Sequence, residues 1–293
     1  MKKIVLTPNP YRDKSFKFVL TAQSYLASAG METRICLPFD VDRGLDLPRG
    51  VVFSNLEQEL PGADMLVCFG GDGTILHASK AATRSNVPVL GVNIGTVGFI
   101  AELESGELEL LRKLPKKEYT IENRSMLDIT VTNGTQQTFH EIALNDAVVS
   151  KGSVARVVRL DVTTEEGRLT KITGDGGIVS TPTGSTGYSM AAGGPIVEPT
   201  ARNLLLTPIC PHSTRAGSYV LSPEHIITIE AADANRKFVY LSVDGGKAFS
   251  LKNGDKVRVR QSRFTTKLVR LSKKSFCEIL DSKMGMEVAT HEE

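Results

Sequence analysis

Residues 65–82 read MLVCFGGDGTILHASKAA, and this stretch decides the fold. Residues 65–69 are apolar throughout, which is typical of a strand covered on both faces of a parallel sheet. GGDGT follows directly at residues 70–74, and the apolar spacing of ILHASKAA predicts a helix. Ligands of open parallel sheets bind at the carboxyl ends of the strands. The stretch therefore predicts an α/β domain with a ligand site at GGDGT.

Outward from this stretch, the first hundred residues alternate between strand and helix patterns. The apolar run at residues 4–6, the strand-like run at residues 33–37 and the buried-strand pattern at residues 87–92 predict strands, and the apolar spacing of residues 16–27 predicts a helix. Strands that alternate with helices favour a mainly parallel sheet with crossover helices. We expect a Rossmann-like N-terminal domain at residues 1–103.

Beyond this domain the pattern changes to one of hairpins. Residues 105–114 predict a helix, after which apolar and polar residues alternate up to Asn133-Gly134, a strong hairpin signal. A second hairpin is expected at residues 156–172, around Glu166-Gly167. Later strands are predicted at residues 225–231, 237–246 and 255–261.

The expected fold class is therefore α/β plus all-β. The β-rich C-terminal domain is expected at residues 104–262. Residues 273–285 have a helical pattern, and we expect residues 263–293 to return to the first domain and complete it.

Composition excludes several classes of function. The 35 basic and 33 acidic side chains leave a net charge of +2, which favours neither nucleic acid nor an anionic membrane as partner. No stretch has the length and apolarity of a membrane span or of a signal peptide. The four cysteines form no C-x-x-C pair, which argues against a zinc site. We expect a cytoplasmic protein with reduced thiols.

The GGDGT segment has the composition of a phosphate-binding loop. Gly70, Gly71 and Gly73 leave room for a phosphate near the backbone, and the helix expected after Thr74 directs its first free N–H groups to the same place. A tight strand-to-helix turn explains the glycines equally well. Asp72 favours the first interpretation, because an idle carboxylate beside phosphates is unfavourable. It can accept a proton from an attacking hydroxyl or bind a divalent ion.

A second segment, GDGGIVSTPTGSTGYSMAAGGPIVEP at residues 174–199, is rich in glycine, serine and threonine. Ser185 or Thr186 is expected to cap a helix that runs into SMAA, and Tyr188 offers a flat face for a purine. A connector made of small residues is the alternative. It explains the glycines but not the many hydroxyl groups.

These motifs together resemble the NAD kinase family. GGDGT, LNDAVV at residues 144–149 and GDGGIVSTPTGSTGYSMAAGGPI follow in the family's order and spacing, and the resemblance extends from NPYRD to VDGG at residues 243–246. It implies transfer of a phosphoryl group from ATP, or from polyphosphate, to the adenosine-ribose 2′-hydroxyl of NAD. It implies that Asp72 accepts the proton, that Gly73 lies beside the substrate, and that Asn145 and Asp146 bind ribose hydroxyls.

The resemblance also implies the remaining site residues and the partners. Asp175 and Phe99 would line the adenine and nicotinamide pockets together with Thr186, Gly187, Tyr188, Ser189, Met190 and Ala191. His77 and Arg156 would face phosphates, although a helix surface and a solvated strand explain them too. A divalent ion such as Mg²⁺ and a dimer or tetramer are also implied.

Two other functions remain open at this stage. GGDGT occurs in lipid and sugar kinases, which need an apolar groove or a sugar-phosphate clamp instead of a nucleoside pocket. A regulator that binds NAD or NADP without turnover would use the glycine loops alone, but it would have no evident use for Asp72.

Overall fold

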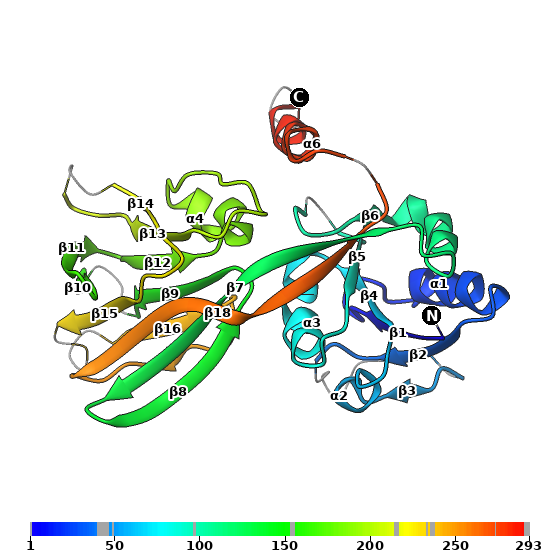
Figure 1. Ribbon diagram of the computed structural model, residues 1–293, viewed down its shortest axis with the longest axis horizontal. Coiled ribbons are helices and arrows are strands. Elements are labelled where there is room, and N and C mark those ends of the chain that lie inside the picture. Colours follow the sequence, from blue (N-terminus) through cyan, green and yellow to red (C-terminus); the bar gives the residue numbers. More distant parts are fainter. Residues whose placement is uncertain are drawn as a thin grey trace. The chain divides into compact units, whose positions relative to one another are not determined.

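The computed structural model describes residues 2–39, 47–48, 50–95, 98–152, 156–213, 217–232, 234, 238–272 and 274–289, with side chains up to residue 285. The chain divides into two compact units. Unit 1 comprises Met1–Asn123 and Thr266–Glu293, and unit 2 comprises Arg124–Thr265. Strands β7 (Thr120–Asn133) and β18 (Asp255–Arg270) each carry residues of both units (Figure 1).

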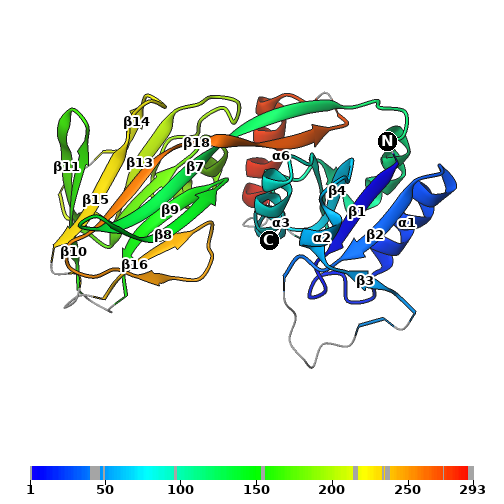
Figure 2. The ribbon, with the colours of Figure 1, turned by 60° about the horizontal axis from the view of Figure 1, so that its bottom comes forward.

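Unit 1 is built on parallel strands in the order β3-β2-β1-β4-β5. This is the order of the first five strands of a doubly wound nucleotide-binding sheet, so the Rossmann-like prediction is confirmed. The strands β1, β2 and β4 run side by side in Figure 2. The elements are β1 (Lys3–Pro8), α1 (Lys17–Ser28), β2 (Glu32–Cys36), β3 (Phe53–Ser54), α2 (Leu56–Glu59), β4 (Met65–Gly70), α3 (Asp72–Arg84), β5 (Val89–Asn93), β6 (Leu103–Glu104), a 3₁₀ helix η1 (Ser105–Lys113) and α6 (Phe276–Ala289).

Burial explains why the central strands of unit 1 are apolar. Every residue of β4 and of β5 is buried, as expected of strands covered on both faces. Helix α1 turns Val19, Ala22 and Leu26 towards the same core. The predicted helical segment after β6 is a 3₁₀ helix instead of an α-helix. The backbone of η1 departs from helical φ and ψ at Glu107. The Glu107 side chain turns back and accepts a hydrogen bond from the Glu104 N–H.

Unit 1 extends to Asn123, later than the expected end at residue 103. The reason is that η1 packs against the unit 1 core through Leu108 and Leu111. The C-terminal segment, Thr266–Glu293, also belongs to unit 1. Helix α6 belongs to this unit, and its Lys283 Nζ lies 2.8 Å from Glu104 Oε1. No helix in the described part of the chain has the length and apolarity needed to cross a membrane.

Unit 2 consists of two antiparallel sheets, in the orders β11-β10-β15-β18-β7-β8 and β14-β13-β12-β9-β16-β17. Leu127, Ile129 and Val131 alternate inward from β7 and share one core with side chains of the second sheet. The β-rich prediction is confirmed. The elements are β8 (Gln136–Ala143), β9 (Asp146–Lys151), β10 (Val158–Thr164), β11 (Gly167–Gly174), β12 (Gly176–Ser180), the 3₁₀ helix η2 (Thr183–Thr186), α4 (Tyr188–Ala191), β13 (Leu204–Ile209), β14 (Tyr219–Leu221), β15 (Ile227–Ala232), β16 (Val239–Val243) and β17 (Phe249–Ser250).

Both predicted hairpins form, with the turns displaced by about one residue. Asn133 pairs with Gln136, so Gly134 is the first turn residue, at φ 57°. Thr164 pairs with Gly167, which leaves residues 165 and 166 in the second turn.

Candidate functional site

The carboxyl ends of β1 and β4 flank the point in unit 1 where the strand order reverses. Open α/β sheets bind ligands at such a point. Asn9 follows β1, and its Nδ2 donates a hydrogen bond to Thr74 Oγ1 at 2.7 Å. The Asn9 N–H donates to the Phe69 carbonyl oxygen at 2.8 Å. The GGDGT loop is therefore tied to the neighbouring strand end.

The three glycines of this loop serve different purposes. A Cβ at Gly70 would overlap the Thr74 side chain, so this glycine is needed for packing, and Thr74 is buried. A Cβ at Gly71 or Gly73 would meet no described atom within 4 Å. Gly71 is the N-cap of helix α3, and no described side chain caps the helix. The first N–H groups of α3 and the space beside Gly71 and Gly73 therefore suit a phosphate.

Asp72 is the first residue of α3, and its carboxylate lies against the loop after β5. Oδ2 accepts a hydrogen bond from the Phe99 N–H at 2.8 Å, and Oδ1 accepts one from the Ile100 N–H at 3.1 Å. A Cβ at Gly98 would lie 2.7 Å from Oδ1, so only glycine permits this approach. The sequence suggested no structural purpose for this carboxylate. That was wrong, because Asp72 also holds the loop.

Burial raises the pKa of Asp72 above its ordinary value, while backbone hydrogen bonds from residues 99–101 and the charge of Lys283 oppose the rise. A carboxylate with a raised pKa is a stronger base than an exposed one. The electrostatics of Asp72 therefore suit proton acceptance.

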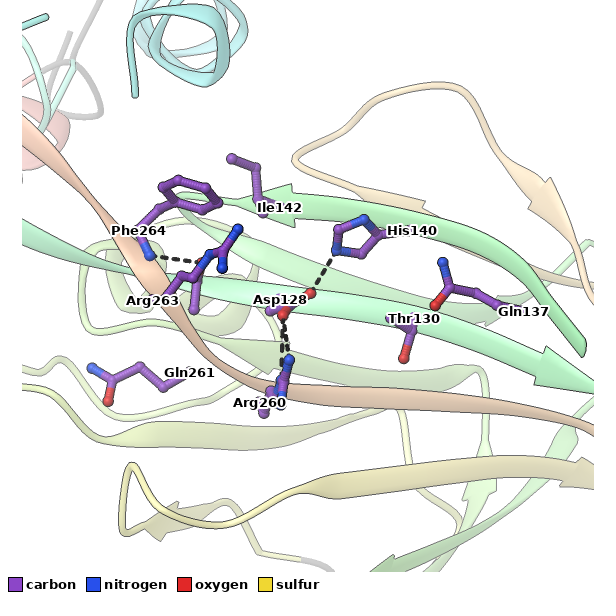
Figure 3. A pocket seen from close by; sticks show the side chains of 10 residues that line it. Asp128, Thr130, Gln137, His140, Ile142, Arg260, Gln261, Arg263 and Phe264 are labelled. Atoms are coloured by element: carbon purple, nitrogen blue, oxygen red, sulfur yellow. Dashed lines mark hydrogen bonds and ion pairs between the residues drawn. The ribbon is translucent and has the colours of Figure 1, made fainter. Parts of the chain in front are cut away.

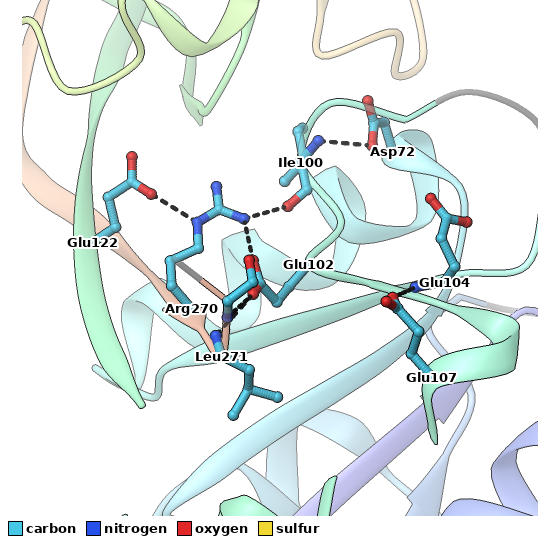
Figure 4. A network of polar contacts seen from close by, with 9 residues as sticks. Asp72, Ile100, Glu102, Glu104, Glu107, Glu122, Arg270 and Leu271 are labelled. Carbon is cyan, nitrogen blue, oxygen red and sulfur yellow. Dashed lines mark hydrogen bonds and ion pairs between the residues drawn. The ribbon is translucent and has the colours of Figure 1, made fainter. Parts of the chain in front are cut away.

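The loop that contacts Asp72 is itself held by a buried ion network (Figure 4). Arg270 donates from Nε to Glu122 at 2.7 Å and from Nη1 to Glu102 at 3.1 Å. Its Nη1 also lies 3.4 Å from the Ile100 carbonyl oxygen. The Glu102 side chain is 4% exposed and also accepts the backbone N–H groups of the two residues after Arg270. The C-terminal return of the chain thus supports the loop at Asp72.

In unit 2, Asn145 and Asp146 lie where β9 begins, next to the turn that follows β12. Gly184 packs so closely on the Asn145 backbone that a Cβ there would overlap the Asn145 carbonyl oxygen. Asn145 Oδ1 is buried and has no hydrogen-bond partner among the described residues. A buried acceptor without a partner requires a donor from elsewhere, and a ribose hydroxyl is one. Asp146 is also buried.

The TPTGSTGY segment is close to Asn145 but is built differently from the expectation. Neither Ser185 nor Thr186 caps α4, which begins at Gly187 without a side-chain cap from the described residues. Ser185 Oγ instead bonds both backbone groups of Val197, and Thr186 Oγ1 donates to the Thr183 carbonyl oxygen. The capping prediction was wrong because these hydroxyls have nearer backbone partners.

Within α4, Ser189 is buried and shares a hydrogen bond with Thr207 Oγ1 at 2.8 Å, so its hydroxyl belongs to the interior. Tyr188 is 47% exposed and Met190 is half-buried. Ala191 is exposed. Tyr188 thus keeps the open face that stacking on a base requires.

Of the other predicted residues, Asp175 and Arg156 lie in unit 2, and His77 and Phe99 lie in unit 1. Asp175 pairs with Lys151 at 2.6 Å, at the end of β12 opposite to Asp146. Arg156 is exposed in unit 2. In unit 1, His77 is exposed and contacts Phe39 edge-on at 5.8 Å, while Phe99 is half-buried in the loop at Asp72. Their contacts with substrate stay predictions.

A solvent-open cavity of about 680 Å³ in unit 2 contains none of the predicted site residues (Figure 3). It lies over β7, β8 and β18, where Asp128 bonds Arg260 at 2.9 Å and His140 at 2.8 Å. Its polar groups are thus partly satisfied by one another. The better candidate site is the loop at Asn145 and the adjoining TPTGSTGY segment, because Asn145 Oδ1 is buried without a hydrogen-bond partner among the described residues.

Substitutions of glycine by alanine test the close packing of Gly184 on Asn145. We expect Gly184→Ala to lower NAD phosphorylation at least tenfold, because the added Cβ displaces the Asn145 backbone. Gly217→Ala in the same unit is the control: a Cβ there would meet no described atom within 4 Å, so its activity should be nearly unchanged. Steady-state kinetics of both variants measure whether the close approach at Gly184 is needed for activity. Equal effects would mean that the close approach at Gly184 is unimportant.

A Rossmann-like unit that carries GGDGT, joined to a β-sandwich unit that carries LNDAVV and TPTGSTGY, indicates a nucleotide phosphotransferase. Family models describe residues 54–119 as an ATP-NAD kinase N-terminal domain and residues 144–271 as an ATP-NAD kinase C-terminal domain. The NAD kinase of Natranaerobius thermophilus is 36% identical, and the match covers 98% of this chain and all of that protein. The chain belongs to the NAD kinase family, and it is a kinase that phosphorylates NAD to NADP.

Further relatives agree with this assignment. The NAD kinase of Symbiobacterium thermophilum is 45% identical over 76% of this chain and 78% of its own. Among solved structures, yeast NADH kinase complexed with NADH has a TM-score of 0.84 at 25% identity, covering 97% of this chain and 88% of that chain. An Archaeoglobus fulgidus NAD kinase in complex with ATP has a TM-score of 0.74 at 25% identity, covering 97% and 98%. These matches favour an NAD kinase over the alternative of a lipid or sugar kinase.

Proposed function

We propose that this enzyme transfers the terminal phosphoryl group of ATP to the 2′-hydroxyl of the adenosine ribose of NAD. The observation that carries the proposal is Asn145 Oδ1, a buried acceptor without a partner among the described residues, beside the buried carboxylate of Asp146. An amide and a carboxylate together suit the vicinal hydroxyls of a ribose. The resemblance to a kinase solved with ATP supports ATP as donor, and polyphosphate stays the alternative.

In this proposal each unit has its own task. Unit 2 binds the nucleosides of NAD through Asn145 and Asp146, with Tyr188 against a base. Unit 1 binds phosphates at Gly71, Gly73 and the first turn of α3, where free N–H groups and the helix dipole favour anions. Asp72 accepts the proton of the 2′-hydroxyl as the oxygen attacks the terminal phosphorus. The raised pKa of Asp72 favours this transfer.

A divalent ion such as Mg²⁺ would be bound here mainly by substrate phosphates. The described residues contain no group of three or more His, Cys, Asp or Glu side chains that could hold a metal ion. Mg²⁺ usually keeps several waters and takes only one or two carboxylates in addition to phosphates. The ion would neutralise charge on the transferred group, and Asp72 would act as the base beside it. The dimer or tetramer and the cytoplasmic location stay predictions.

The acceptor is tested by supplying Mg²⁺ and ATP labelled at its terminal phosphate together with one acceptor class at a time. We expect label in NAD and none in diacylglycerol or fructose 6-phosphate. NADH belongs in the same series, because the yeast relative is described as an NADH kinase. Labelling of a lipid or sugar without labelling of either dinucleotide would overturn the proposal.

Asp146→Ala should raise the KM for NAD at least about tenfold. Loss of a charged hydrogen-bond acceptor costs ~1.5–3 kcal/mol, and this contact exists in the ground state as well as the transition state. The control is Asp128→Ala, which removes a carboxylate of the same unit from the cavity in Figure 3 and should leave the KM unchanged. An unchanged KM in a folded Asp146→Ala enzyme would remove Asp146 from the site.

A further inference from the structure

The backbone of residues 144–146 is fixed by an unusually complete set of hydrogen bonds. All three N–H groups donate to one side chain, Asp244. The Leu144 N–H donates to Asp244 Oδ2 at 2.9 Å, and the N–H groups of Asn145 and Asp146 donate to Oδ1 at 2.8 and 3.1 Å. These bonds join residues about one hundred positions apart in the sequence. One carboxylate therefore fixes the backbone of residues 144–146, which we call the LND segment.

The three carbonyl oxygens of the same segment are also satisfied. Thr181 Oγ1 donates to the Leu144 oxygen at 2.6 Å, and the Thr181 N–H donates to the Asn145 oxygen at 2.9 Å. The Asp244 N–H donates to the Asp146 oxygen at 3.0 Å. Two residues, Asp244 and Thr181, thus satisfy all six backbone polar groups of residues 144–146. Every backbone polar group of the segment therefore has a partner within the protein.

Both partners sit in positions that are themselves tightly defined. Asp244 has φ 48° and Gly245 φ 66°, and the Gly246 N–H donates to the Val243 oxygen, as in a type I′ turn. Thr181 is 1% exposed, and its Oγ1 also accepts the Gly184 N–H at 3.1 Å. The Thr181 hydroxyl therefore joins the LND segment to the TPTG turn. A carboxylate that accepts several backbone N–H groups holds them more firmly than neutral acceptors do.

From these contacts we infer that Asp244 and Thr181 are positioning residues for NAD. They hold the LND backbone in one conformation, so that Asn145 and Asp146 meet the ribose hydroxyls without having to be ordered on binding. Preorganisation of this kind lowers the cost of binding. The inference rests on the proposed function of Asn145 and Asp146, and it adds two residues that act through them.

Two substitutions at Thr181 separate positioning from simple stability. Thr181→Val keeps the shape and removes the hydroxyl, so it should raise the KM for NAD about tenfold and leave the KM for ATP unchanged. Thr181→Ser keeps the hydroxyl and removes a buried methyl, so it should lower the melting temperature while the KM for NAD stays near wild type. If the KM for NAD rises in the variant with the lower melting temperature, whether or not that variant keeps the hydroxyl, the inference is overturned.

Asp244→Asn provides an independent test. An amide presents one acceptor oxygen and one NH₂ group to three N–H donors, so at least one of the three bonds is lost. We expect a KM for NAD at least about tenfold higher, and faster hydrogen exchange in the peptide that contains residues 144–146. The matched control is Asp64→Asn, because Asp64 accepts the N–H groups of Lys2 and Lys3 in unit 1. It should leave the KM unchanged.

The outcomes distinguish this inference from the proposed function. If the wild-type enzyme forms no NADP, the proposed function fails, whatever the variants do. If the wild type forms NADP and both Thr181→Val and Asp244→Asn bind NAD with wild-type KM, only the positioning inference fails. Faster exchange at residues 144–146 with unchanged KM also contradicts it, because the segment would then be loosened without consequence for binding.

Discussion

Asp72→Asn should lower kcat by roughly 10²–10⁴-fold while NAD still binds, because the substitution keeps the shape of the side chain and removes its basicity. A loose, dissociative transition state would place the loss near the lower end of this range. The amide oxygen can still accept one of the two loop N–H groups that Asp72 accepts. Steady-state rates and calorimetry of NAD binding therefore measure the chemical and structural contributions separately.

The same substitution has a signature in the pH profile. Only the ionised carboxylate accepts a proton, and burial raises its pKa. In the wild type, kcat/KM should therefore fall as the pH decreases through this raised pKa, at a higher pH than the value of about 3.9 for a free aspartate. The residual activity of the Asn variant should lack that acidic limb. Near-normal kcat in the variant would show that Asp72 is neither the base nor an essential metal ligand.

Arg270→Met should lower the free energy of unfolding by about 3–5 kcal/mol, because it leaves Glu102 as a buried carboxylate without its cation. Urea unfolding measures the loss. The control is Arg260→Met. Arg260 also pairs with a carboxylate, Asp128 (Figure 3), at 2.9 Å. Its side chain is 61% exposed, so the change should cost about 0–1 kcal/mol. Equal losses in the two variants would contradict the assignment of the Arg270 network as a buried one.

Local patterns were sufficient to predict most of the elements. The uninterrupted apolar run before GGDGT corresponds to β4, all of whose residues are buried, and the alternation around Ile129 corresponds to β7 in the sandwich core. The unit boundary was harder to predict, because β7 and β18 continue through it without a break in their pattern. The prediction of a helix cap was wrong because the Ser185 hydroxyl bonds the backbone of Val197 instead.

The supporting residues of the candidate site could not be predicted, because their contacts join distant parts of the chain. Asp244 and Asn145 are 99 positions apart, and Arg270 and Glu102 are 168 apart. No periodicity in a single sequence encodes such pairs. The one available signal was the Asp-Gly turn in VDGG, which favours a tight turn but says nothing about the three N–H groups that its carboxylate accepts.

The central claim is that this protein makes NADP, and the most direct measurement is NADP formation by the purified protein with Mg²⁺, ATP and NAD, detected with a dehydrogenase that accepts only NADP. The account predicts steady NADP formation that requires all three components and that falls at least about 10²-fold in Asp72→Asn. No NADP from the folded wild-type protein, with ATP or with polyphosphate as donor and with NAD or NADH as acceptor, would contradict it.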